Sequence, residues 1–219
     1  MKILLVNPPF QYTLSSCQPK ILEEGIEYLP PLGLMYIAGY LRKHTNHQIK
    51  ILDCQVEEIS YPKLEEKIKE FSPDVVGVTA MTFTLIDATK VAETAKKVSP
   101  KIKTIFGGPH VNIYPEETMQ IGVVDFVVLG EGEEPVKELL EKIEDTKKLY
   151  EIKGILFRDG NKVINTGHRA LIQNLDIMPF PARDMTPYTK YSSVLAKSPP
   201  VTTMFTSRGC PYKCLFCDR

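Results

Sequence analysis

The sequence predicts an α/β fold, a Rossmann- or flavodoxin-like doubly wound parallel sheet, and three observations lead to this prediction. Short, β-branched apolar runs recur along the first 130 residues, bounded by Gly, Pro or Asp. Longer segments with apolar residues at helical spacing separate these runs. Small and polar residues follow the runs. Strands that alternate with helices usually pair in parallel and are covered on both faces, which makes them apolar throughout.

Five apolar runs are the predicted strands. Each is short enough for a buried strand and too short for a buried helix. They cover residues 3–6, 49–52, 75–79, 102–106 and 126–129.

Four segments between and after these strands are the predicted helices. The segment 85–98 repeats alanine and valine at helical spacing, which predicts one buried face. The segment 32–41 follows Pro30-Pro31, and proline is well tolerated where a helix begins. The remaining two predicted helices cover 64–71 and 136–143.

The sequence changes character after residue 145. Residues 154–157 and 162–164 flank an Asp159-Gly160 turn signal, which predicts a β-hairpin. Prolines then recur up to residue 200, and they exclude a continuous helix or a central strand. We therefore predict an ordered linker after the hairpin.

The last residues are expected to open a second domain. Residues 201–206 form a β-prone run that predicts a strand leading into a cysteine-rich segment. The predicted divisions are a sheet domain over 1–145, the hairpin and linker over 146–200, and the start of another domain over 201–219.

The composition is that of an ordinary globular protein. Hydrophobic residues make up 43% of the 219 residues and charged residues 25%, and the formal net charge is zero. A neutral balance provides no general attraction to nucleic acid. No run reaches the roughly 18 apolar residues that a membrane span needs, and the first residues do not form a secretory signal. We expect a cytoplasmic protein without a membrane span, and we expect Cys17 and Cys54 to be free thiols.

Three cysteines, Cys210, Cys214 and Cys217, have the spacing Cys-x3-Cys-x2-Cys. A four-iron cluster in an electron carrier uses four thiolates, so three would leave one iron open to another ligand. The alternative is zinc, which in structural sites needs four ligands, usually as two close pairs. His168 or Cys54 could supply the fourth through space. Thiols without a ligand role are the third interpretation.

The segment Ser207-Arg208-Gly209-Cys210-Pro211-Tyr212-Lys213-Cys214-Leu215-Phe216-Cys217 resembles the cluster loop of the radical S-adenosylmethionine superfamily, with Phe216 as the common aromatic residue before the third cysteine. The resemblance implies a 4Fe-4S cluster whose open iron chelates S-adenosylmethionine. Reduction, by an electron donor such as flavodoxin or ferredoxin, would then yield a 5′-deoxyadenosyl radical that acts on a small-molecule substrate.

That resemblance also concerns the extent of the chain. In the superfamily the cluster loop follows the first strand of a partial (β/α) barrel, whereas this sequence ends two residues after Cys217. We therefore expect an N-terminal fragment with a truncated barrel, inactive as it stands. Beyond the cluster ligands, no catalytic residue is expected within it.

Ligands of open α/β sheets bind at the carboxyl ends of the strands. A phosphate loop is disfavoured there, because neither Gly-x-Gly-x-x-Gly nor the Walker pattern follows the first strand. Two carboxylates, Glu131 and Glu133, would also repel a phosphate. The candidate binding residues at the strand ends are Asn7, Asp53, Gln55, Thr79, Met81, Thr82, Gly107, Gly108, Gly130, Glu131 and Gly132.

The order of these segments resembles the cobalamin-binding domain that precedes the radical domain in one subgroup of the superfamily. The matching segments are Asn7-Pro8-Pro9, Pro30-Pro31-Leu32-Gly33-Leu34, Val76-Gly77-Val78-Thr79-Ala80-Met81, Phe106-Gly107-Gly108-Pro109-His110 and Asp125 to Glu133. The resemblance implies that the nucleotide tail of cobalamin enters a slot between sheet and helices. It also implies that Thr79 offers a hydroxyl to the benzimidazole and that glycine at 107 and 108 leaves room for the tail.

The segment Asp53-Cys54-Gln55-Val56-Glu57-Glu58 departs from Asp-x-His-x-x-Gly, the pattern of methionine-synthase-type cobalamin domains. Gln55 stands where that pattern has its cobalt-binding histidine, and an amide is a poor cobalt ligand. The resemblance therefore implies a lower cobalt face that is vacant, water-bound or loosely approached by Gln55. His110 is a rival ligand.

The predicted function is that of a cobalamin-dependent radical S-adenosylmethionine enzyme. A methyltransferase is favoured, because that is the commonest activity in the subgroup. The alternatives are a non-methylating enzyme, such as an anaerobic oxidative cyclase of tetrapyrrole synthesis, and a domain that has lost cobalamin and serves as a binding module. A cobalamin-binding sensor or carrier is a further alternative, disfavoured by the cysteine spacing.

Overall fold

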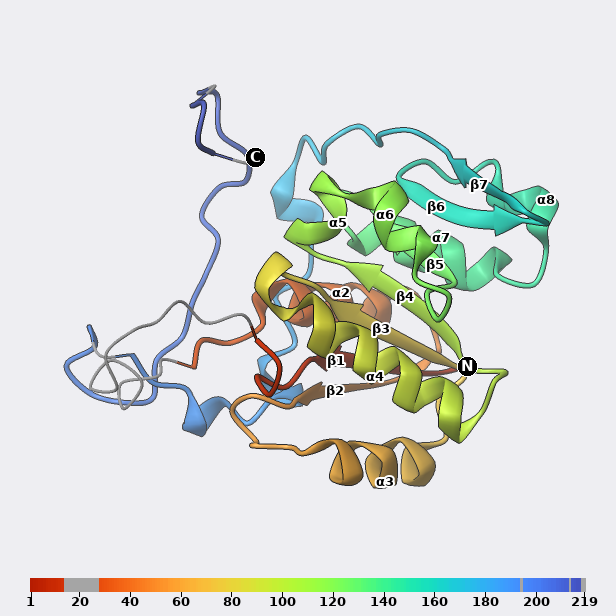
Figure 1. Ribbon diagram of the computed structural model, residues 1–219. Coiled ribbons are helices and arrows are strands. Elements are labelled where there is room, and N and C mark those ends of the chain that lie inside the picture. Colours follow the sequence, from red (N-terminus) through yellow and green to blue (C-terminus); the bar gives the residue numbers. More distant parts are fainter. Residues whose placement is uncertain (14–27, 194, 213, 218–219) are drawn as a thin grey trace.

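The computed structural model describes residues 1–13, 28–193, 195–212 and 214–217. Within them, one seven-stranded sheet has the order β2-β1-β3-β4-β5-β6-β7 (Figure 1). The first five strands in this order are parallel, and β6 and β7 are antiparallel additions. The strands are β1 (Lys2–Asn7), β2 (Gln48–Asp53), β3 (Val75–Thr79), β4 (Lys103–Gly107), β5 (Phe126–Val128), β6 (Ile155–Asp159) and β7 (Lys162–Asn165).

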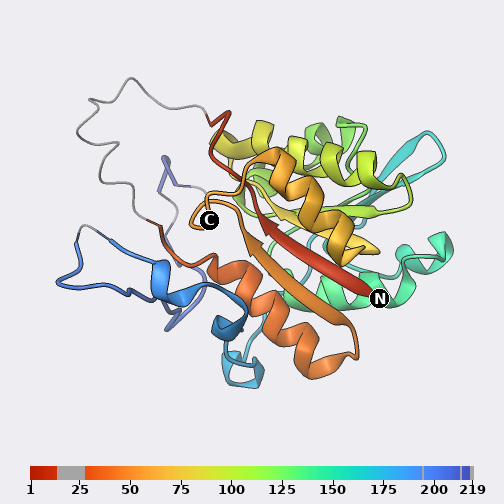
Figure 2. The ribbon, with the colours of Figure 1, turned by 90° about the horizontal axis from the view of Figure 1, so that it is seen from below.

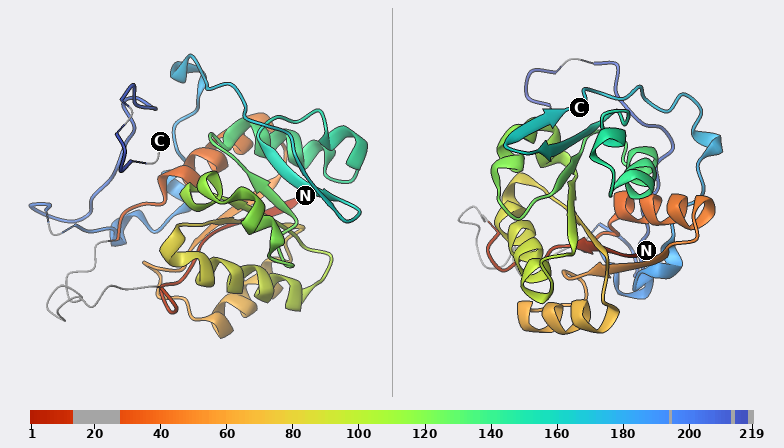
Figure 3. Two further views of the ribbon diagram at one scale, coloured as in Figure 1. Left: turned by 45° about the horizontal axis from the view of Figure 1, so that its top comes forward. Right: turned by 90° about the vertical axis from the view of Figure 1, so that its right-hand side faces the viewer.

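Helices connect the strands and cover both faces of the sheet. The α-helices are α2 (Leu32–His44), α3 (Tyr61–Phe71), α4 (Leu85–Val98), α5 (Pro109–Ile113), α6 (Pro115–Gln120), α7 (Glu133–Lys142) and α8 (Thr146–Leu149). Short 3₁₀ turns are η1 (Thr82–Thr84), η2 (Leu175–Ile177), η3 (Arg183–Met185) and η4 (Tyr188–Lys190). Helices α2 and α7 lie on one side of the sheet and α3 to α6 on the other (Figure 3).

Alternate residues of each strand enter two separate cores, which is why the parallel strands are apolar throughout. On β1, Leu4 and Val6 pack toward α3 and α4, whereas Ile3 and Leu5 pack toward α2 and α7. All four are buried. Side chains of successive strand residues point to opposite faces, so a strand covered on both sides needs apolar residues at every position.

The order β2-β1-β3-β4-β5 is that of a flavodoxin-like doubly wound sheet, as predicted. The chain direction across the sheet reverses between β1 and β3, and a crevice is expected at that point of the carboxyl edge. The hairpin β6–β7, grouped with the linker in the sequence analysis, pairs with β5 and extends this same sheet.

The four predicted helices are present, with ends that differ by up to three residues from the prediction. Helix α4 has the predicted bounds, whereas α7 begins at Glu133 rather than at 136. Helices α5 and α6 were not predicted. They span five and six residues, too few for a periodic pattern to emerge.

The linker packs beside α2 (Figure 2). The Ala182 amide donates to the carbonyl of Met35, which lies on α2, over 2.9 Å. Arg42 and Asp184 form an ion pair of 2.6 Å at the far end of the same contact. These two contacts therefore hold the described part of the linker against the sheet domain.

The strand predicted at 201–206 is not observed, and this prediction was wrong for the described residues. Residues 201–205 have no regular structure, and most of residues 201–206 are exposed. A strand is stabilised by hydrogen bonds to a neighbour, and this segment has no ladder partner among the described residues. The segment instead runs along the edge where the parallel strands end (Figure 1).

Among the described residues, no helix combines the length and the apolar character needed to cross a membrane.

Candidate cofactor site

An apolar slot of about 410 Å³ lies between the sheet and helices α2 and α7. It runs from the amino-terminal ends of β1 and β3 to the carboxyl edge of the sheet. Strand residues form one wall and helix residues the other. The lining residues are Ile3, Leu5, Gly33, Leu34, Ile37, Val75, Gly77, Val78, Thr79, Ile105, Gly107, Gly108, Val128, Gly130, Glu131, Gly132, Glu133, Val136, Phe205, Ser207, Arg208 and Gly209.

The two adjacent glycines at the end of β4 contribute in different ways. A Cβ on Gly107 would meet the Val128 carbonyl oxygen at 4.0 Å, an ordinary contact, so a side chain there would extend into the slot. Gly108 has a φ of 101°, and a Cβ there would lie 2.9 Å from the Ala80 carbonyl oxygen. The protein itself therefore requires glycine at 108. Of the two glycines that were expected to leave room for the cofactor tail, only Gly107 has free space beside it.

Thr79 lies beside these glycines because β3 and β4 pair in register. Thr79 is opposite Gly107, and its hydroxyl oxygen would be 2.9 Å from a Cβ on Gly108. Thr79 therefore lies at the wall of the slot, and a contact of its hydroxyl with the benzimidazole stays a prediction.

Six of the predicted binding residues line this slot. They are Thr79, Gly107, Gly108, Gly130, Glu131 and Gly132. The other five lie elsewhere on the carboxyl edge. Asn7, Asp53 and Gln55 belong to a polar network at the ends of β1 and β2, and Met81 and Thr82 lie at η1.

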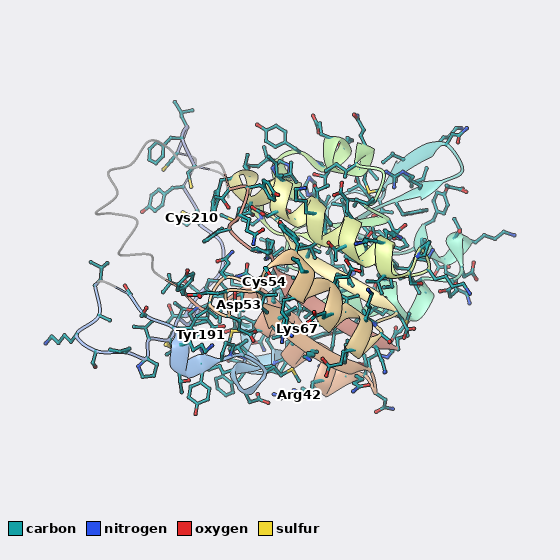
Figure 4. The ribbon with its side chains drawn as sticks, turned by 60° about the horizontal axis from the view of Figure 1, so that its bottom comes forward. Arg42, Asp53, Cys54, Lys67, Tyr191 and Cys210 are labelled. Carbon is teal, nitrogen blue, oxygen red and sulfur yellow. The ribbon has the colours of Figure 1, made fainter. Side chains whose placement is uncertain are left out.

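The polar network is centred on the buried Asp53 carboxylate. It accepts hydrogen bonds from the Asn7 amide over 2.8 Å and from the Tyr191 hydroxyl over 3.0 Å. Tyr191 comes from the linker and is itself buried (Figure 4). Burial raises the pKa of the Asp53 carboxyl above its ordinary value, and these hydrogen bonds partly oppose that rise.

Gln55 is tied to the same network. Its amide nitrogen donates to the Asn7 side-chain oxygen over 3.2 Å and to the Pro8 carbonyl over 3.1 Å. These bonds hold the Gln55 side chain against the end of β1. Gln55 does not line the slot in the described residues.

His110, the rival ligand, is held by η1 and α5. Its Nδ1 lies 3.1 Å from the Thr82 hydroxyl, and its ring packs against Tyr114 at 5.3 Å. Burial lowers the pKa of the His110 imidazole, which favours the neutral form. Only 6% of His110 is exposed, and it does not line the slot.

The mouth of the slot carries a cluster of charges. Arg208 donates from its two terminal nitrogens to Glu131 over 2.9 Å and to Glu133 over 2.6 Å. From the sequence, we expected these two carboxylates to repel a phosphate. In the structure they share one guanidinium.

The three motif cysteines lie on an exposed segment beyond this mouth (Figure 4 marks Cys210). The Cys217 amide donates to the Cys214 carbonyl over 3.2 Å, which forms a turn. Within the described ranges, no three His, Cys, Asp or Glu side chains are grouped closely enough to hold a metal. The assignment of the cysteines as cluster ligands stays a prediction. Three thiolates are nevertheless a donor set that fits iron–sulfur chemistry.

The two other cysteines differ in what the structure describes. Cys54 is buried and free. Burial, with a contribution from Asp53, raises the pKa of its thiol, so Cys54 remains protonated and is a poor metal ligand. Cys17 lies outside the described residues.

A scan against protein families gives one decisive match. Residues 24–140, more than half of the chain, match the model of the B12 binding domain. The chain belongs to the B12-binding domain family. This B12-binding domain extends from α2 into α7, and these elements carry most of the slot walls.

Curated proteins align with the chain beyond the B12-binding domain. An uncharacterized methyltransferase of Pyrococcus horikoshii is 40% identical over the whole chain, which covers 45% of that protein. An anaerobic magnesium-protoporphyrin IX monomethyl ester cyclase of Rubrivivax gelatinosus is 30% identical, with 87% of this chain and 35% of the relative covered. Hopanoid C-3 methylase of Methylococcus capsulatus is 30% identical over the whole chain, 39% of that protein. The chain thus spans less than half of each relative.

Solved structures share the fold. The radical S-adenosylmethionine methyltransferase TsrM from Kitasatospora setae, with cobalamin and a [4Fe-4S] cluster bound, superposes with a TM-score of 0.59 and 18% identity, covering 76% of this chain and 30% of that one. The cobalamin-dependent S-adenosylmethionine radical enzyme OxsB gives a TM-score of 0.60 and 16% identity, covering 84% and 24%.

The residues of the B12-binding domain fit the cofactor that its family name implies. The slot is apolar and open at the carboxyl edge, and Gly107 leaves space in it because glycine has no side chain. Ile37 and Val136 on the helix wall, and Arg208 at the mouth, were not among the residues predicted from the sequence to bind the cofactor. The apolar periodicity of α2 and α7 marks a buried face. It does not distinguish a face that packs fully from one that leaves a slot.

Proposed function

We propose that this chain holds cobalamin and the iron–sulfur cluster of a radical S-adenosylmethionine methyltransferase. One observation carries the proposal. Gly107 lines the slot, and Arg208 and Gly209 line its mouth. These two residues directly precede the first motif cysteine in the sequence. The site for a cofactor tail and the segment with three thiols therefore lie side by side.

The chain's own residues have separate roles in this proposal. Ile37 and Val136 on the helix side and Ile105 on the sheet side would enclose an aromatic base and exclude water. The Thr79 hydroxyl would hydrogen-bond a ring nitrogen. When bound, cobalamin would supply the methyl group that the reaction transfers.

Gln55 would not act as a cobalt ligand in place of histidine. Its amide nitrogen is engaged by Asn7 and Pro8, and an amide oxygen is a weak donor for cobalt. The proposal therefore assigns Gln55 to holding the ends of β1 and β2 together.

Cys210, Cys214 and Cys217 would hold the 4Fe-4S cluster. The cluster would supply the electron that cleaves S-adenosylmethionine, after reduction by a donor such as flavodoxin or ferredoxin. The substrate would be a small molecule.

An oxidative cyclase is the second candidate, favoured by the 30% identity to the magnesium-protoporphyrin ester cyclase. The two candidates differ in the use of the S-adenosylmethionine methyl group. The full-length parent protein, loaded with cobalamin and reduced, would be incubated with methyl-labelled S-adenosylmethionine. Label recovered in the corrin fraction supports the methyltransferase, and its absence favours the cyclase.

Cobalamin binding is tested by titrating the purified chain with hydroxocobalamin and recording the corrin absorption bands. We expect the bands to shift and the corrin to elute with the protein through a desalting column. Unchanged bands and complete loss of corrin on desalting would remove cobalamin from the proposal.

The cluster ligands are tested by anaerobic reconstitution with iron and sulfide. We expect the iron content to fall in Cys214→Ala and to stay at the wild-type value in Cys54→Ala, the matched control with a buried cysteine. Equal iron in Cys214→Ala and the wild type would contradict the assignment.

A further inference from the structure

Arg208 joins the cysteine segment to the B12-binding domain. It stands two residues before Cys210, and its guanidinium bonds to Glu131 and Glu133, which are more than 70 residues away in sequence. A guanidinium that bonds two carboxylates through separate nitrogens holds a defined orientation. The contact therefore fixes where the segment enters the carboxyl edge.

Two aromatic rings complete the contact. The guanidinium carbon lies 4.8 Å from the ring centre of Tyr36 on α2 and 5.7 Å from that of Phe205. The two rings stack on each other at 5.9 Å, with their planes 17° apart. A cation over an aromatic face is attracted by the ring, and the attraction grows as water is excluded.

The charges of this cluster are shielded from solvent. The exposed fraction of the side chain is 18% for Arg208, 18% for Glu131 and 5% for Glu133. Glu133 is the first residue of α7, where the helix dipole favours a carboxylate. The second oxygen of Glu131 accepts from the Ile172 amide over 2.7 Å. These bonds satisfy the two carboxylates in their present positions.

The same cluster lies across the mouth of the slot. Phe205, Ser207, Arg208 and Gly209 line the slot together with Gly130 at the carboxyl edge. Ile3 and Val75, from the opposite halves of their strands, line its inner part. A large ligand that enters from the carboxyl edge therefore meets the cysteine segment first.

We propose that Arg208, Glu131, Glu133, Tyr36 and Phe205 form a latch that holds the cysteine segment across the mouth of the slot. The latch opens when the tail of the cofactor enters or leaves. Arg208 is a positioning residue in this arrangement. The inference rests on the proposed function in one respect, namely that the entering ligand is cobalamin.

Arg169 provides a matched control. It also bonds two carboxylates, Glu134 and Glu138, each over 2.7 Å, and its side chain is 27% exposed. Arg169 does not line the slot in the described residues. The two arginines thus share their pairing chemistry and differ in their relation to the slot.

The test measures the rates of hydroxocobalamin association and release by stopped-flow absorption on the 219-residue chain. We expect Arg208→Gln and the double variant Glu131→Gln, Glu133→Gln to raise both rates about fivefold, since opening then breaks fewer contacts. Arg169→Gln should change neither rate by more than about twofold. Salt should raise both wild-type rates and affect the Arg208→Gln rates less, because it screens the ion pairs.

Rates within about twofold of the wild type in Arg208→Gln would overturn the proposal. Faster release with unchanged association would also overturn it, because Arg208 would then be a ligand contact and no barrier to entry.

A second measurement needs no cofactor. The chain contains no tryptophan, so Phe205→Trp introduces a single fluorescent reporter in the latch. We expect acrylamide to quench this tryptophan more strongly when Arg208→Gln is added, and equal quenching would overturn the latch. Failure of the wild type to bind cobalamin would count against the proposed function, and the quenching result would then decide the latch by itself.

Discussion

Gly107 and Gly108 are neighbours in sequence, yet different constraints act on them. The structure leaves space for a side chain on Gly107 toward the slot, and it leaves none on Gly108, whose backbone has a positive φ. A pair of glycines in a ligand-binding motif therefore need not contribute equally to the ligand. One of them can be required by the fold.

Gly107→Val should weaken hydroxocobalamin binding about tenfold and leave the free energy of unfolding nearly unchanged, because valine fills the slot and suits a strand. Gly108→Ala should instead lower the free energy of unfolding by roughly 1–3 kcal/mol, because alanine must adopt a positive φ beside Ala80. Equilibrium binding and urea unfolding check both outcomes. Normal affinity in a folded Gly107→Val variant would exclude a ligand at this point of the slot.

Asp53 should make stability depend on pH in an unusual direction for a carboxyl group. Its pKa in the folded state is raised by burial above the ordinary value of 3.8, so the folded protein binds the proton more tightly than the unfolded chain. The contribution of Asp53 to stability is therefore complete below pH 3.8 and is lost as the pH rises through the folded-state pKa.

The measurement compares urea unfolding of the wild type and Asp53→Asn over a series of pH values. The difference in unfolding free energy should favour the wild type increasingly as the pH falls through that window. A difference that moves in the opposite direction would mean that the hydrogen bonds from Asn7 and Tyr191 outweigh burial.

At the scale of elements, the contact between α2 and the linker depends on one glycine. A Cβ on Gly39 would lie 2.6 Å from the Phe180 carbonyl oxygen, a backbone atom that cannot move without its segment. Glycine inside a helix normally costs about 1 kcal/mol relative to alanine. Here it allows the linker backbone to approach the helix closely.

Gly39→Ala should therefore destabilise the protein by about 1–3 kcal/mol, opposite in sign to its effect in an open helix. Gly33→Ala, on the same helix with no atom of the described residues within 4 Å of the added Cβ, is the control and should be neutral or stabilising. Thermal unfolding measures both variants. Stabilisation by Gly39→Ala would show that the linker does not hold this position.

At the scale of the whole molecule, the linker returns to the first two strands of the sheet. The Tyr191 hydroxyl bonds to Asp53 at the end of β2, 138 residues earlier. The linker thus passes from the hairpin edge of the sheet, along α2, to the opposite edge strand (Figures 1 and 2). This course places residues after 200 on the carboxyl edge, beside the slot.

Tyr191→Phe removes a hydrogen bond to a buried carboxylate and should lower the free energy of unfolding by about 1.5–3 kcal/mol. It should also make the linker more sensitive to limited proteolysis. Tyr188→Phe is the matched control, because Tyr188 is on the same linker and is 59% exposed. Equal digestion patterns for the two variants would contradict an anchoring role for Tyr191.

The parallel sheet, its two-sided cover and its family resemblance were accessible from the sequence, because apolar runs and helical spacing are local patterns. The glycines at 107, 130 and 132 were recognised in the same way, since small residues at strand ends mark a binding edge. The predicted strand at 201–206 failed because a strand depends on a neighbour, which no local pattern supplies.

Local patterns were enough to place small and polar residues at the strand ends and to find three thiols with an open spacing. The packed fold was needed to show that Gly107 and not Gly108 makes room, that Gln55 bonds to Asn7, and that Arg208 pairs with Glu131 and Glu133. The difference lies in the range of the interactions. Propensity and periodicity act over a few residues, whereas a slot and an ion pair depend on the packing of segments far apart in the chain.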